Sequence, residues 1–298
     1  MALLVTALLL QGCSIRQMAV NAVGDALSSG GSVFENDEDV VLVGEALPFS
    51  LKMLDALVAQ SPQHRGLLLA TSRGYLLYAY AYVGETAERL ADTDVEQAEA
   101  ARRRAHRLYL RAHSYALRGL ESAYPGLREA LAENPEAALA GVGTTNPDID
   151  VALMHSAAAT LGLAIASDKQ SAAMLARLPE VDAYLKRALD LDEAWNGGSL
   201  HEFAVTWLAS RPGPRQDDAV DRHFVRAREL SAGRRAGLFV SYAEATKVPA
   251  QQRDEFTRLM NQALAVELDA FPDDRLLNAL AQRRARWLLS RLDQLFLE

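Results

Sequence analysis

The chain has 298 residues, of which 50% are hydrophobic and 23% are charged, and its formal net charge is −8. These values are typical of an ordinary soluble globular protein with room for one large core or two smaller ones. The acidic balance argues against nucleic acid as a partner, and a single cysteine excludes both an internal disulfide and a zinc–thiolate cluster.

The N-terminal segment contains a short apolar run, residues 2–10, just before the only cysteine, Cys13. A membrane-spanning helix needs about 20 apolar residues, so this run is too short to span and is typical of a secretory signal. The stretch LLLQGC is similar to the bacterial lipobox, although no Lys or Arg precedes the run. We therefore predict a signal peptide over residues 1–12 and a tether over residues 13–46 that begins at the lipidated Cys13. The alternative is a hydrophobic N-terminus with a buried free thiol.

The body of the chain is divided by prolines into segments rich in Ala, Leu, Arg and Glu. A proline inside a helix costs about 3 kcal/mol, and apolar residues recur at helical spacing between the prolines, so these segments predict helices. One strand-like patch, residues 39–47, is short and isolated, and we expect an all-α fold. The expected helices are about 49–60, 64–90, 95–122, 126–140, 149–168, 180–192, 199–210, 216–231, 236–246, 250–268 and 274–296.

A spacing of small and apolar residues repeats in the second half of the chain. Ala188, Ala227 and Ala263 each lie between apolar residues three positions away, and they are 39 (188 to 227) and 36 (227 to 263) residues apart. A period of about 34 residues, with a small residue where two helices cross, is typical of tetratricopeptide (TPR) helix pairs. We predict an α-solenoid of degenerate TPR-like helix pairs in a single domain over residues 47–298, with a generic helical bundle as the alternative.

Tyrosines cluster in the stretch GYLLYAYAYV, where Tyr75, Tyr78 and Tyr82 lie on one face of the expected helix and Tyr80 lies to the side. Tyrosine combines apolar area with a polar tip, which suits a groove or a subunit interface. The alternative is core packing against neighbouring helices.

The stretch GGSLHEF places Ser199, His201 and Glu202 close together. A zinc-protease helix would need a second histidine where the chain has Val205, and a hydrolase elbow would need a glycine at position 201 after a strand. Both catalytic interpretations fail, whereas Ser199 and Glu202 fit the two ends of a helix capping box. The remaining histidines are scattered singly, and no phosphate-binding or calcium-binding loop pattern occurs. We therefore predict no catalysis, no metal site and no cofactor.

Several long stretches of the chain resemble one family. They are LLLQGCS, GGSVFENDEDVVLVGEALPFSLKMLDALVAQSPQHRGLLLATSRGYLLYAYAYV, WNGGSLHEF, ARELSAGRRAGLFVSYAEA and LLNALAQRRARWLL. The resemblance is to the T-component of tripartite ATP-independent periplasmic (TRAP) transporters (TatT), and it extends from the signal region to the C-terminal helix.

The resemblance implies a periplasmic lipoprotein of TPR-like helix pairs without known catalysis. It also implies association with the substrate-binding P-component of a TRAP transporter and assembly into a homo-oligomer, a trimer. The residue after Cys13 is Ser14. In enterobacteria-like systems an Asp at this position marks a lipoprotein for retention in the inner membrane, so the lipid anchor is expected in the outer membrane.

Polar or amphipathic residues within these stretches are candidate contacts for a ligand or a partner protein on the concave face of a solenoid. They are Trp195, Asn196, His201, Glu202, Tyr242 and Asn278. Each also has a structural explanation, such as a turn at Asn196 or a helix crossing at Tyr242. The hypothesis is a scaffold that holds the P-component, or its cargo, near the membrane. The alternatives are a helical lipoprotein that carries a small amphipathic ligand and a TPR adaptor in envelope assembly.

Overall fold

The computed structural model describes residue 22, residues 34–211, residue 213 and residues 215–297. All regular secondary structure in these residues is helical, and no strand occurs among them, which confirms the all-α prediction. The predicted signal peptide and the lipidated Cys13 lie outside the described residues, as does most of the predicted tether. The TPR-like pairing of the helices in a solenoid stays a prediction.

Contacts divide the described chain into two compact units. Unit 1 consists of residues 45–184, and unit 2 consists of residues 34–44 together with residues 185–297. Each unit has its own cluster of buried apolar side chains. The prediction of a single domain over residues 47–298 stays a prediction.

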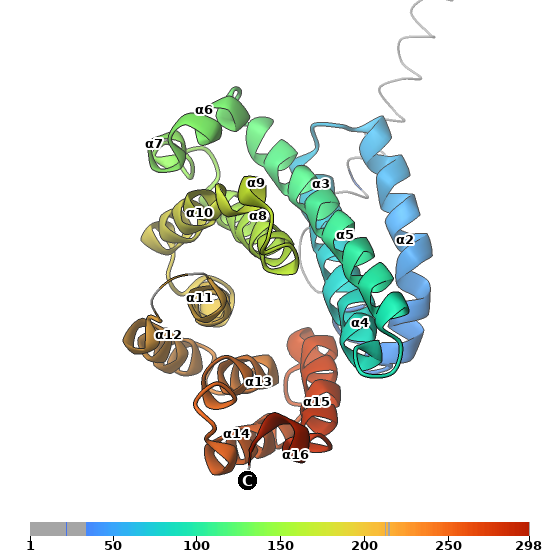
Figure 1. The fold of residues 1–298 in the computed structure, drawn as a ribbon. Coiled ribbons are helices and arrows are strands. Elements are labelled where there is room, and N and C mark those ends of the chain that lie inside the picture. Colours follow the sequence, from blue (N-terminus) through green and yellow to red (C-terminus); the bar gives the residue numbers. More distant parts are fainter. Residues whose placement is uncertain (1–21, 23–33, 212, 214, 298) are drawn as a thin grey trace, which may run out of the picture. The chain divides into compact units, whose positions relative to one another are not determined.

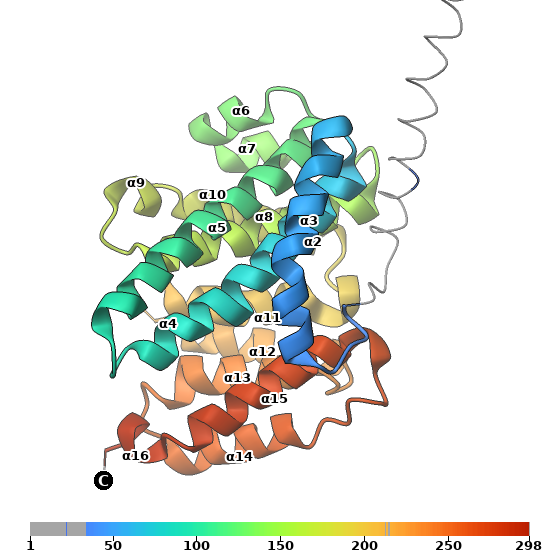
Figure 2. The same cartoon turned by 90° about the vertical axis from the view of Figure 1, so that its right-hand side faces the viewer.

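Unit 1 is built around α5 (Val95–Glu121), which packs along α3 (Arg65–Tyr78) and α8 (Pro147–Ser167), as Figures 1 and 2 show. Its core joins Leu68 of α3 to Ala112 of α5. The other elements of this unit are most of α2 (Val40–Gln60), the π-helical segment η1 (Ala79–Gly84), α4 (Glu85–Leu90), α6 (Leu127–Glu133), α7 (Pro135–Leu139), α9 (Ala172–Leu175) and the first half of α10 (Leu178–Leu191).

Unit 2 contains two sets of packed helices. In the first, α11 (Trp195–Ser210) packs on α12 (Asp217–Leu230). In the second, α13 (Ala236–Tyr242), α14 (Arg253–Leu264) and α15 (Arg275–Leu289) pack on one another. This unit also contains the first residues of α2, the second half of α10, the π-helical segment η2 (Ala243–Lys247), the 3₁₀ turn η3 (Pro272–Asp274) and α16 (Leu292–Leu295).

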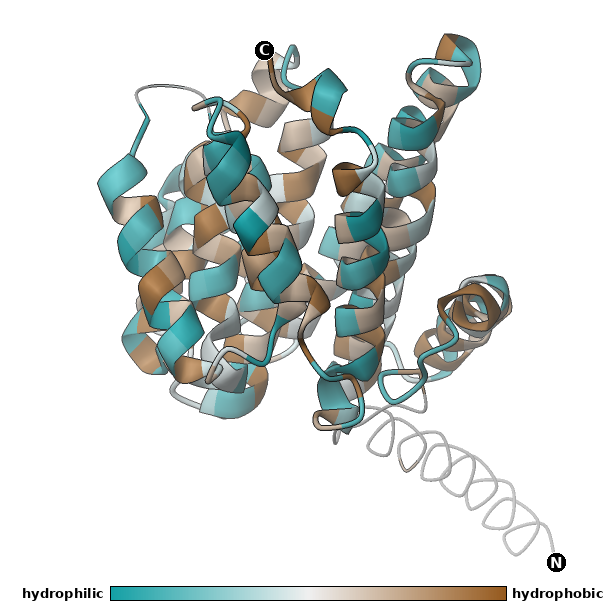
Figure 3. Cartoon of the chain, turned by 90° about the horizontal axis from the view of Figure 1, so that it is seen from below, coloured by the Kyte–Doolittle hydropathy of each residue, from teal (hydrophilic) through white to brown (hydrophobic). Residues whose placement is uncertain are grey.

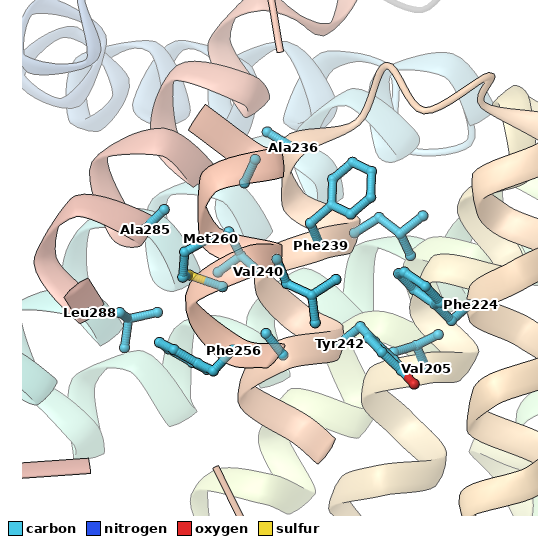
Figure 4. Close-up of a cluster of buried hydrophobic side chains, with 14 of the residues drawn as sticks. Val205, Phe224, Ala236, Phe239, Val240, Tyr242, Phe256, Met260, Ala285 and Leu288 are labelled. Carbon is cyan, nitrogen blue, oxygen red and sulfur yellow. The ribbon is translucent and has the colours of Figure 1, made fainter. Parts of the chain in front are cut away.

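Apolar side chains from α11 to α15 form the core of unit 2 (Figure 4). The ring of Phe224 stacks on Tyr242 with 3.9 Å between centroids, and Phe256 and Met260 lie beside Leu288. Burying a side chain of this size contributes about 1.5–3 kcal/mol to folding. Hydrophilic and hydrophobic residues alternate along the helices in Figure 3, as expected when each helix buries one face.

The strand-like patch at residues 39–47 is helical, and the helix expected at 49–60 begins earlier, because α2 starts at Val40 and continues through Pro48. Asp39 caps this helix, since one of its carboxylate oxygens accepts the backbone N–H groups of Val41 and Leu42, each at 3.0 Å. A cap of this kind contributes about 1 kcal/mol, and valine is accommodated when one helix face is buried. The last residues of the predicted tether therefore belong to a helix.

Several expected helices are interrupted. The expected helix at 126–140 is divided into α6 and α7, because the side chain of Asn134 accepts a backbone N–H of α7 at 3.1 Å and Pro135 takes the first helical position. The helices expected at 64–90 and 236–246 pass into the π-helical segments η1 and η2, each of which begins directly after a tyrosine. The division at Asn134 depends on a single side-chain cap, which helical periodicity does not report.

Among the described residues, α8 is the one helix long and apolar enough to cross a membrane by length and composition. Most of its apolar stretch is buried within the folded chain. Its buried Asp150 accepts the hydroxyl of Tyr124 at 2.6 Å and pairs with Arg65 of α3. These contacts are those of a core helix in a folded unit.

Candidate functional site

The candidate site begins at a turn in the stretch WNGGSLHEF. Asn196, Gly197 and Gly198 have positive φ angles of 46°, 60° and 87°, so the regular part of α11 starts at Ser199. A Cβ added at Gly198 would lie 3.0 Å from the Cβ of Leu230 in α12. The glycines therefore let the start of α11 approach the end of α12 closely.

Arg235, directly before α13, is the buried centre of the site. Its Nη2 donates to the carbonyl oxygen of Asn196 at 2.6 Å, and its Nη1 donates to the hydroxyl of Ser199. Two carboxylates compensate its charge, with Oε2 of Glu202 at 3.3 Å from Nη1 and Oδ1 of Asp274 at 3.5 Å from Nη2. A buried guanidinium needs such partners because removing its charge from water is costly.

Asn278 of α15 holds the same segment through its backbone. This side chain is 1% exposed; its Oδ1 accepts the N–H of Ala236 at 2.9 Å, and its Nδ2 donates to the carbonyl oxygen of Arg234 at 3.0 Å. The Nε of Arg234 in turn donates to Asp274 at 3.0 Å. A buried amide with both ends satisfied fixes the start of α13 relative to α15.

His201 of α11 and His223 of α12 form a pair. Their Nδ1 atoms are 2.8 Å apart, so one ring nitrogen donates and the other accepts. Burial lowers the pKa of both rings, and the neighbouring His201 further lowers the pKa of His223, to about 4. Oε2 of Glu193 lies 3.6 Å from Nε2 of His201, and Glu193 also pairs with Arg226.

Tyr242 makes its contacts in the core of unit 2, and Trp195 directly precedes Asn196 in the chain. The ring of Tyr242 belongs to the core stack with Phe224, and its hydroxyl donates to Asp221 at 2.7 Å. Burial, together with this hydrogen bond, raises the pKa of Tyr242 to about 12. Trp195 is the half-buried first residue of α11.

A family model described as "TRAP transporter T-component" matches residues 36–296. The chain belongs to the TRAP transporter T-component family. A protein of Treponema pallidum (strain Nichols), described only as uncharacterized, is 29% identical over 310 residues, which cover 98% of this chain and 95% of that protein. The family is one of transporter components and not of enzymes, and membership indicates association with a TRAP transporter in the periplasm or at a membrane.

In this T-component, the structure brings together three of the six residues that the sequence singled out. Asn196, Glu202 and Asn278 meet around Arg234 and Arg235. A contact of any of the six with a ligand or partner stays a prediction. The sequence reasoning missed both arginines, although their position in the stretch SAGRRAGL, inside a family-like motif, was an available signal.

The structure also shows what the remaining polar groups of the motif do. The predicted capping box is wrong, because the hydroxyl of Ser199 bonds to Asn196 and Arg235. His201 is engaged by His223, so Ser199 and His201 do not form a nucleophile–base pair. No group of three or more His, Cys, Asp or Glu is placed to hold a metal ion within the part of the chain that the structure describes. This arrangement is suited to holding a turn in one shape.

Proposed function

We propose that the chain is a periplasmic, lipid-anchored scaffold of a TRAP transporter that docks the substrate-binding P-component. The observation that carries the proposal is the family match over residues 36–296, which includes both units and all six candidate residues. In this proposal the acidic, helical body acts through its position and its contacts. Its polar clusters connect helices and leave Asn196, in the turn at the start of α11, exposed.

The proposed anchor is Cys13. Two or more acyl chains on one residue give stable membrane attachment, whereas a single chain is marginal. Cys13→Ala is expected to move the protein from the membrane fraction to the soluble fraction. Ser14→Asp is expected to retain the anchored protein at the inner membrane. Membrane attachment that survives Cys13→Ala would overturn the anchor.

The proposed docking contacts are Trp195, Asn196 and Glu202. Asn196 is exposed, and Trp195 and Glu202 are half-buried, so these side chains are accessible at the turn. Tryptophan is the residue type most often found at the energetic centre of protein interfaces. His201, Tyr242 and Asn278 are buried, and in this proposal they support the turn or the helices beside it. The six candidate residues thus divide into three contacts and three supports.

The test is capture of the P-component encoded beside this chain on the immobilised protein. Trp195→Ala is expected to weaken capture by about tenfold or more, since truncating such an anchor costs upwards of about 2 kcal/mol. Tyr80→Ala removes an aromatic ring that is 51% exposed in unit 1 and is expected to leave capture unchanged. Failure of the unmodified chain to capture the P-component under gentle conditions would overturn the proposal.

A further inference from the structure

The His201–His223 pair is the one place in the described part of unit 2 where two titratable rings serve as each other's partner. The rings lie 5.0 Å apart between centroids, with their Nδ1 atoms 2.8 Å apart. Two protonated nitrogens cannot donate to each other, so this contact requires at least one Nδ1 without a proton. The contact therefore exists in the neutral or singly protonated state of the pair and not in the doubly protonated one.

The surroundings of the pair do not favour two positive charges. The charged groups that face it are Glu193 before α11 and both Arg222 and Arg226 of α12. Glu193 is already paired with Arg226, which also pairs with Glu229, and Glu193 is the one carboxylate that the described structure places within 4 Å of either histidine ring. Like charges at this separation repel by an amount that grows as the site is removed from water.

The pair lies beside the turn that carries the proposed docking contacts. His201 is three residues after Gly198, whose backbone packs against Ala227 and Leu230 of α12. A separation of α11 from α12 at the histidines would therefore remove the support on which this turn rests. The turn contains Asn196 and follows Trp195 directly.

We propose that the His201–His223 pair is a proton-sensitive lock: it holds α11 on α12 at neutral pH, and its double protonation in acid releases the Trp195–Asn196 turn and weakens docking of the P-component. The part of this inference that concerns docking of the P-component rests on the proposed function. The sign follows from linkage, because rings with a lowered pKa in the closed state bind protons more tightly when the contact opens. The lock is complete above about pH 6.5 and is lost as the pH falls toward about 4.

Hydrogen exchange of the purified full chain at pH 7.5 and pH 5, corrected for the intrinsic exchange rate, tests the lock without a partner. Protection in α11 and α12 is expected to fall by about tenfold at pH 5, and protection in α5 is expected to stay the same. His223→Asn keeps a hydrogen-bonding side chain without a titrating ring and should reduce this pH dependence to the part that the buried His201 contributes. His64→Asn is the matched control, since it replaces a histidine that caps α3 with another capping residue.

Equal protection of α11 at both pH values would overturn the lock, and so would a loss of protection in acid that is as large in His223→Asn as in the unmodified chain. If that variant does not fold, NMR titration of the unmodified chain decides: ring pKa values at or above about 6.5 would overturn the lock. Capture of the P-component at the two pH values tests whether acid weakens docking. Equal capture would overturn the regulation and leave the proposed function standing, whereas no capture at either pH would overturn the proposed function.

Discussion

At the turn at the start of α11, position 198 requires both a positive φ and the absence of a Cβ. Its φ of 87° lies in the left-handed region, which costs a residue with a side chain about 1–2 kcal/mol. A Cβ there would also lie 3.0 Å from the Cβ of Leu230 and 3.3 Å from the Cα of Ala227. Gly126 has nearly the same φ, 84°, but a Cβ built there meets no described atom within 4 Å. A side chain at either position would have the conformational cost of a positive φ, but only at position 198 would it also have a steric cost.

Gly198→Ala is expected to lower the free energy of unfolding by about 3–4 kcal/mol, and Gly126→Ala by about 1–2 kcal/mol. The difference arises because the new methyl group at position 198 must displace the end of α12. Urea unfolding followed by circular dichroism measures both variants. Equal losses would show that α12 moves aside without cost.

At the scale of elements, α2 has two contrasting faces. Leu51 is 3% exposed and belongs to the core of unit 1. Two residues earlier, Phe49 is 72% exposed, and Met53 is 49% exposed on the same side of the helix. Exposed apolar side chains that gather on one helix face are typical of an interaction surface.

Leu51→Ala is expected to cost about 2–5 kcal/mol of unfolding free energy, because it leaves a cavity in the core. Phe49→Ser on the same helix is expected to change it by less than about 0.5 kcal/mol, because the ring faces water. Chemical unfolding of both variants provides the comparison. A cost for Phe49→Ser near that of Leu51→Ala would mean that this face is covered in solution.

Asp55 ties α2 to two other helices of unit 1. Its carboxylate accepts the hydroxyls of Tyr75 at 2.8 Å and Tyr115 at 2.7 Å, and it pairs with Arg111 at 2.7 Å. Burial opposes ionisation, but hydrogen bonds from Lys52, Tyr115 and Tyr75 and the charge of Arg111 outweigh it and lower the pKa of Asp55. Tyr75, which could have lined a groove, therefore lies in the core as part of this cluster.

Because the pKa of Asp55 is lowered on folding, its stabilising contribution is complete above the ordinary value of 3.8 and is lost as the pH falls below it. Asp55→Asn is expected to cost about 1.5–3 kcal/mol at pH 7, since the hydrogen bonds to a charged acceptor are lost. The difference from the unmodified chain should shrink between pH 4 and pH 2. Unfolding curves across this range would contradict the assignment if the difference stayed constant.

The sequence predicts most of the helices of the fold, but it predicts few of the side-chain contacts in the candidate site. Prolines and helical periodicity predict where most of the helices lie, although α2 continues through Pro48, and the Asn–Gly–Gly run predicts the turn at the start of α11. The partners of Arg235 and of His201 come from other helices, so they depend on how α11, α12 and α13 cross. Single-residue patterns hold no information on those crossings. The valines at the start of α2 have a strand-like pattern, but the Asp39 cap places them in a helix.

At the scale of the whole molecule, two clusters of buried apolar side chains among the described residues have separate memberships. The core of unit 1 joins side chains of α2, α3 and α5, and the core of unit 2 joins side chains of α11 to α15. Each set of contacts is compact, and local opening in proteins follows such cooperative sets. A change at the centre of one unit is therefore expected to act on that unit first.

Arg235→Met tests this expectation at the charged centre of unit 2. Methionine fills part of the volume but removes the cation that Glu202 pairs with and leaves Asp274 with Arg234 alone, which is expected to cost about 3 kcal/mol. Hydrogen exchange should show lost protection in α11, α12 and α13, with α3 and α5 unchanged. Arg253→Met is the control: its partner Asp293 is 89% exposed, so its loss should cost less than about 1 kcal/mol. Equal loss of protection in α5 and α11 would mean that the two units open together, because a defect confined to one core would then have reached the other.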